Sequence, residues 1–161
     1  MDPDVEARSD DGRNETQAER LDRNWAELLQ ELRVVQTGTQ ILTGFLLTLV
    51  FQQRFTELEP YQVEIYLILV ALSALATVLA LTPVSLHRAL FRQRAKPQIV
   101  GFTNTIMQLT LIVVALTLTG TTLLVFDVVA GPVAGIIAGS VTLLLATLAW
   151  AFLPAFARRR R

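Results

Sequence analysis

The sequence predicts an all-α fold in which four transmembrane helices form a bundle and the first helix carries an amphipathic extension. Three observations predict it. The 161-residue chain is 52% hydrophobic. Its apolar residues gather in four runs without charge, residues 34–53, 65–86, 97–126 and 128–157. Each run reaches the roughly 20 residues that a helix needs to cross a bilayer. The alternative is a soluble bundle, but a soluble helix normally carries a charged stripe, which these runs lack.

The first element begins after an acidic, polar segment, residues 1–15, which we expect to be a disordered tail. Thr16 and Glu19 have the spacing of a capping box, which starts a helix. Apolar residues then recur at helical spacing with charged residues opposite them, so the stretch is amphipathic. Nothing interrupts the helix up to about residue 53, and at 1.5 Å per residue it is about 55 Å long. Its first half must therefore lie outside the hydrocarbon.

The other elements are bounded by prolines and charged joints within a membrane domain that we assign to residues 16–157. Pro60 suits the first turn of the second helix, and Pro83 either kinks or ends that helix. Pro154 stops the fourth helix before a basic C-terminal tail, residues 158–161. The predicted spans are about 34–53, 61–82, 99–122 and 132–153.

The charges predict the orientation of the bundle. Bases crowd the second joint and the C-terminus, at His87, Arg88, Arg92, Arg94, Lys96 and Arg158 to Arg161. The opposite loops hold one base, Arg54, among acids. The positive-inside rule therefore places both termini in the cytoplasm of a cell whose inner (plasma) membrane holds the protein. We expect Arg88, Arg92, Arg94 and Lys96 also to bind anionic lipid head groups.

Three segments carry a resemblance to a known family. They are "ELLQELRVVQTGTQILTGFLLTLVFQQRF", "TPVSLHRALFR" and "FDVVAGP". Over about Trp25 to Pro154 the chain resembles a family of small bacterial four-helix membrane proteins of unknown function. Some of its members are automatically labelled sodium:proton antiporters. The resemblance implies a fold and a membrane location, but no tested activity and no residue roles.

Polar residues in the first and third helices form a candidate interhelical cluster. Gln36, Gln40 and Thr43 share one face of the first helix, and Asn104 and Gln108 are one turn apart in the third. An unpaired amide in hydrocarbon costs several kcal/mol, so we expect these side chains to bond to one another between the helices. The alternatives are a polar vestibule for a solute or ion, or simple hydration at the interface. We expect Gly38 and Gly44 to let neighbouring helices approach.

Small residues in the fourth helix predict close packing. Gly131, Gly135 and Gly139 are spaced four apart, which lets helix backbones touch. The packing is expected to lie within the chain, with a homodimer face as the alternative.

Three ionisable residues are further candidates. Asp127 is interpreted as a helix cap or interfacial turn residue, with a proton carrier as the alternative, and Glu64 lies at the same membrane edge. His87 is interpreted as a solvated base at the interface. A pH sensor is the alternative for His87, since imidazole titrates near neutral pH.

The residue types in the sequence limit the functions that the chain can have. The chain has no cysteine and one histidine, and it shows no paired carboxylates, phosphate loop or nucleophile–base pair. We therefore expect no enzyme, no cofactor, no metal site and no nucleic-acid partner. The leading hypothesis is a structural or interaction component whose partners are membrane lipids and another copy or another membrane protein. The alternative is a small ion- or solute-coupled transporter. It is disfavoured because such transport uses ionisable groups inside the membrane, and none of the predicted spans carries one near its middle.

Overall fold

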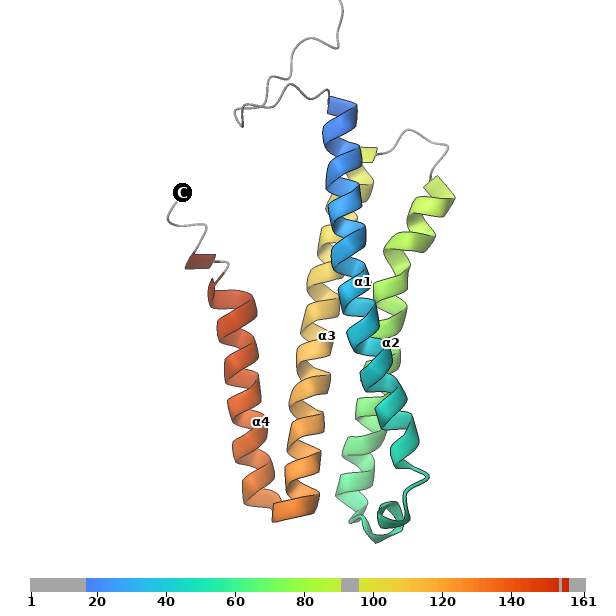
Figure 1. The fold of residues 1–161 in the computed structure, drawn as a ribbon. Coiled ribbons are helices and arrows are strands. Elements are labelled where there is room, and N and C mark those ends of the chain that lie inside the picture. Colours follow the sequence, from blue (N-terminus) through green and yellow to red (C-terminus); the bar gives the residue numbers. More distant parts are fainter. Residues whose placement is uncertain (1–16, 91–95, 154, 157–161) are drawn as a thin grey trace, which may run out of the picture.

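The fold is a row of four long helices, each antiparallel to the one before it (Figure 1). The computed structural model describes residues 17–90, 96–153 and 155–156. The helices are α1 Gln17–Leu49, α2 Pro60–Leu90, α3 Lys96–Ala130 and α4 Pro132–Thr147, with a short 3-10 helix η1 Gln53–Glu57 and a π-helical segment η2 Leu148–Phe152 that continues α4. The all-α prediction and the number of helices are confirmed. The predicted tails, residues 1–15 and 158–161, lie outside the described residues.

The helices do not close into a ring. α2 packs against both α1 and α3, α1 also touches α3, and α4 lies along α3 at the side away from α1 (Figure 1). We call the end with η1 and the α3–α4 connection the turn end. The opposite end, where α1 begins and η2 lies, is the terminal end (Figure 1).

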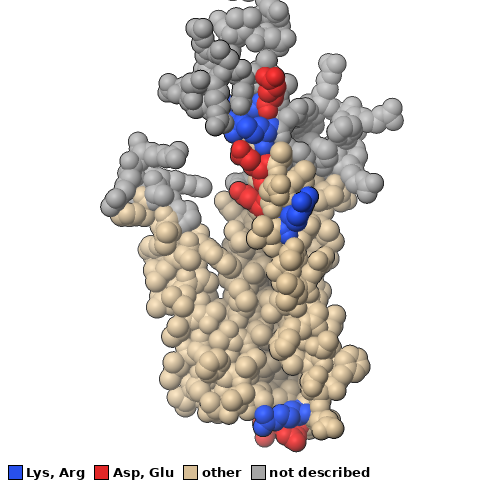
Figure 2. Space-filling view, in the orientation of Figure 1, with Lys and Arg blue, Asp and Glu red and all other residues tan. Residues whose placement is uncertain are grey.

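An uncharged belt surrounds the middle of the bundle. On the face in Figure 2, charged side chains gather at the two ends and leave a broad uncharged surface between them. Three helical segments are long and apolar enough to cross a membrane, Pro60–Leu86, Thr105–Ala130 and Pro132–Phe152. α1 is not among them, because its apolar part ends at Leu49 and contains Gln36, Gln40 and several threonines. Large apolar side chains such as Ile68, Ile112 and Ile136 are exposed along the belt.

Two predicted boundaries need correction. α2 does not end at Pro83, which lies inside the helix and is buried. α3 runs to Ala130, so Asp127 lies within its last turn, and the expectation that Asp127 caps a helix or lies in a turn is wrong. The chain reverses instead at Gly131, which has a φ of 91°. This conformation suits glycine because it has no Cβ, and Pro132 then supplies a fixed φ for the first turn of α4.

One cluster of the core lies near the turn end. Leu46, Tyr66, Leu69 and Leu124 are buried together there, and the rings of Phe55 and Tyr66 meet edge to face with centroids 4.9 Å apart. The Tyr66 hydroxyl donates to the carbonyl of Leu46 at 3.0 Å. Leu46 is in the last turn of α1, where carbonyls have no partner within the helix. The tyrosine therefore fixes the end of α1 to α2.

Candidate functional site

The glutamine cluster is not assembled as the sequence predicted. Gln36 is half-buried, and its Nε2 donates to the backbone carbonyl of Ala80 in α2 at 3.1 Å. Gln40 and Gln108 are exposed. Thr43 keeps a buried Oγ1 without a hydrogen-bond partner, and the side chain of Asn104 lies outside the described residues. The expectation that Gln36 pairs with an amide of α3 is wrong, since its partner is a backbone carbonyl of α2.

The partner of Gln36 lies in the turn that Pro83 interrupts. A proline inside a helix removes one backbone hydrogen bond and its ring displaces the preceding turn. In a membrane helix the affected carbonyls are paired by side chains or by neighbouring helices. Pro83 takes the N–H from the carbonyl of Leu79, and the two carbonyls on either side of it receive side-chain donors. The Thr82 hydroxyl donates to the carbonyl of Val78 at 2.8 Å, and Gln36 reaches the carbonyl of Ala80 from α1. We call the contact of Gln36 with Ala80 the proline lock. It joins α1 to the turn of α2 that precedes Pro83.

A second polar contact joins α2 to α3 at the turn end. The Tyr61 hydroxyl donates to Oδ1 of Asp127 at 3.2 Å, and Nε2 of Gln62 donates to the Tyr61 oxygen at 3.3 Å. Oε1 of Gln62 also accepts from the backbone N–H of Glu59 at 3.0 Å. Gln62 and Asp127 are both buried. The sequence offered one signal for this network, because Tyr61 begins the second predicted span and Asp127 follows the third at the same membrane edge.

The glycines of α4 lie against α3, as predicted for packing within the chain. A Cβ on Gly135 would come within 2.8 Å of both the Cβ of Asp127 and the carbonyl oxygen of Leu123. A Cβ on Gly139 would lie 3.0 Å from the Cβ of Leu123. Gly131 has no such neighbour, so its role is in the turn and not in packing.

Other glycines have different surroundings from those expected. Gly38 and Gly44 are exposed, and a Cβ on either would meet nothing within 4 Å. The expectation that they admit a neighbouring helix is wrong. Gly120 was not singled out from the sequence, yet a Cβ there would clash with the Leu69 side chain of α2. Close packing therefore depends on Gly120, which faces α2, and on Gly135 and Gly139, which face α3.

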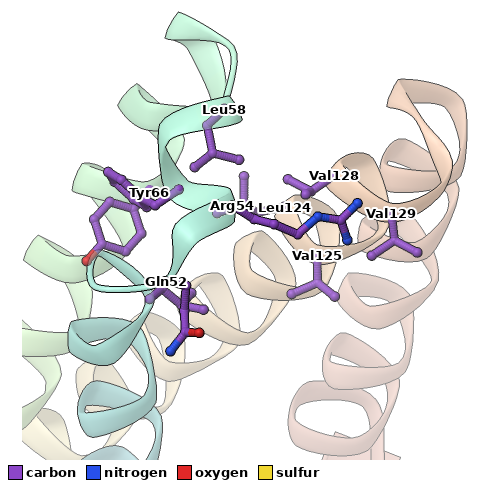
Figure 3. A pocket seen from close by; sticks show the side chains of 10 residues that line it. Gln52, Arg54, Leu58, Tyr66, Leu124, Val125, Val128 and Val129 are labelled. Carbon is purple, nitrogen blue, oxygen red and sulfur yellow. The ribbon is translucent and has the colours of Figure 1, made fainter.

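An apolar cavity of about 150 Å³ lies at the turn end between η1, α2 and α3 (Figure 3). We call it the turn-end cavity. Its lining residues are Leu49, Gln52, Arg54, Phe55, Leu58, Tyr66, Leu124, Val125, Val128 and Val129. Tyr66 and Leu124 are buried and form its floor, whereas Arg54, Val125 and Val129 are exposed at its rim. The Arg54 side chain extends toward Val128 and Val129 (Figure 3).

The remaining candidates do not gather into a chemical centre among the described residues. Glu64 is exposed on α2. Within the described ranges, no three His, Asp or Glu side chains lie close enough together to hold a metal ion. The predictions for His87, Arg88, Arg92, Arg94 and Lys96 fall on side chains outside those that the structure describes.

Comparison with known proteins gives one result. The sequence profile of a family of unknown function matches residues 14–154. No curated protein and no solved structure matches the chain. The proline lock, the Tyr61–Asp127 contact and the turn-end cavity must therefore be interpreted from their own chemistry.

Proposed function

Since the chain belongs to DUF6328, a family of unknown function, we propose from its physical chemistry that it is a four-span integral membrane protein with a non-enzymatic structural or interaction role. The uncharged belt carries this proposal. Three helices qualify as spans by length and composition. α1 lies beside α2, and 20 uncharged residues separate Arg33 from Arg54. Residues 34–49 of this stretch are helical and rise about 24 Å at 1.5 Å per residue, and residues 50–53 continue the uncharged stretch toward the roughly 30 Å of a bilayer core.

The interaction role rests on the part of α1 that extends beyond the belt. Residues 19–33 of this helix carry both signs of charge, and Arg23 pairs with Glu27 one turn away at 3.2 Å. Such pairs favour a water-exposed helix. This extension is the largest charged helical surface among the described residues (Figure 2), and it is where we place a protein partner.

The orientation proposed is the one that the bases favour, with the terminal end in the cytoplasm and the protein in the inner membrane. The chain has no cysteine, so a single introduced cysteine reports one position. We expect a cysteine at Glu57 to react with an impermeant maleimide in intact cells, and a cysteine at Gln93 to react only after the membrane is opened. Labelling of Gln93 with protection of Glu57 would invert the orientation.

The second candidate function is an ion-coupled transporter, and the buried carboxylate of Asp127 is the observation that favours it. Carboxylates within spans often serve ion pathways. However, Asp127 already accepts a hydrogen bond from Tyr61, and Gly135 packs directly against it. Both contacts support a structural role for this side chain.

We therefore expect purified protein in liposomes to dissipate an imposed pH gradient no faster than protein-free liposomes, with or without sodium. The measurement is the fluorescence of a trapped pH dye, and the control is the Asp127→Asn variant, which should behave identically. Flux that needs sodium and disappears in Asp127→Asn would reverse the ranking of the two functions.

A further inference from the structure

We propose that the turn-end cavity is a binding site for a phospholipid, with an acyl chain in the cavity, the phosphate on Arg54 and an ammonium-bearing head group beside the acidic residues of that end. Nothing in the sequence patterns indicated this site, because its lining comes from four separate segments. The proposal goes beyond a structural role, since it assigns a specific ligand class to one place in the fold.

The size and lining of the cavity favour an acyl chain. An apolar cavity of about 150 Å³ accepts a guest the size of benzene, and the turn-end cavity has this volume and opens at an exposed rim. Its exposed rim residues Val125 and Val129 lie in the segment of α3 that is apolar enough to span a membrane. A guest therefore enters from the lipid phase, where acyl chains are the most abundant apolar groups.

Arg54 supplies the polar half of the site. It lies in η1 at the edge of the belt, and its side chain extends over the α3 side of the cavity (Figure 3). Among the described residues no carboxylate lies within ion-pair distance of its guanidinium. Guanidinium binds phosphate through two parallel hydrogen bonds. A lipid phosphate at the membrane surface thus provides the partner that the chain does not supply.

The charges around Arg54 select among head groups. Glu57, Glu59 and Glu64 are exposed at the same end, so this end carries more negative than positive charge. A head group with a net negative charge would be repelled. A zwitterionic head group with an ammonium places its positive charge near these carboxylates while its phosphate remains on Arg54.

The test uses the full chain in detergent micelles, to which phosphatidylethanolamine or phosphatidylglycerol is added. Because a ligand that binds only the folded state raises the melting temperature, the titration reports apparent affinity, and native mass spectrometry counts the retained lipids. We expect phosphatidylethanolamine to stabilise the protein more than phosphatidylglycerol does. Arg54→Gln should weaken binding about tenfold or more, since a hydrogen bond to a charged group contributes about one to two factors of ten.

Matched variants separate the site from general lipid effects. Arg33→Gln removes the arginine at the other edge of the belt and should leave the titration unchanged. Val128→Phe places a larger side chain in the lining and should abolish the shift, whereas Val133→Phe makes the same substitution on an exposed residue of α4 and should not.

If Arg54→Gln and Val128→Phe are both stabilised by lipid as strongly as the wild-type protein, the proposed binding site is refuted. If Val128→Phe does not fold, Arg54→Gln alone decides, because Arg54 is exposed. Equal stabilisation by the two lipids would overturn the head-group assignment. A stable dimer that binds no lipid would show that a second copy fills the cavity and would also refute the proposal.

Discussion

Replacing Gly135 by leucine is expected to lower the free energy of unfolding by about 3 kcal/mol or more, near the upper end for overpacking. The side chain would have to enter the space occupied by the Cβ of Asp127 and the carbonyl oxygen of Leu123, both only 2.8 Å from an added Cβ. Neither group is the flexible end of a long side chain, so α4 must move away from α3. The movement would also displace Asp127 and weaken its hydrogen bond from Tyr61.

Unfolding of the purified protein in detergent micelles, followed by circular dichroism, measures this effect. Gly44→Leu is the matched control, because a Cβ on Gly44 meets nothing within 4 Å. Leucine is also the better helix former, by up to about 1 kcal/mol, so this control should be neutral or stabilising. Similar losses in both variants would contradict the close approach of α4 to α3. Unchanged stability with loss of a cross-linked dimer would mean that the glycine face is intermolecular.

Replacing Gln36 by leucine is expected to cost about 0.5–1.5 kcal/mol, the net contribution of a typical hydrogen bond. The bond lost is the one that Nε2 of Gln36 donates to the carbonyl of Ala80 at 3.1 Å. The loss should depend on Pro83. In a Pro83→Ala background the backbone regains an N–H and the regular ladder of α2 can form, so α2 needs less support from α1.

A double-mutant cycle of Gln36→Leu with Pro83→Ala measures this dependence directly. We expect a coupling energy of about 0.5 kcal/mol or more, the level that distinguishes contacting residues from independent ones. Gln40→Leu serves as the control, because Gln40 is exposed and its replacement should change stability little. If a second cycle instead shows a coupling energy between Gln36 and Gln108, and none is found between Gln36 and Pro83, then Gln36 pairs with α3 as the sequence suggested.

The features of this protein divide into those that the local sequence dictates and those that depend on packing between helices. The sequence by itself determined the number of helices and the uncharged belt. These features depend on the length of the apolar runs and on where the charged residues interrupt them. Both are local properties, so they can be read along the chain without knowing what packs against what.

Only the tertiary structure decided which side chains meet. It directed Gln36 to a carbonyl of α2, buried Asp127 within α3, left Gly38 and Gly44 exposed and created the turn-end cavity. The physical reason is that the helices of the uncharged belt are apolar on most sides. Periodicity identifies a buried face only when the other face is polar. The rotation of each helix, and hence the partner of each polar or small residue, was therefore fixed by packing between helices and not by the local sequence.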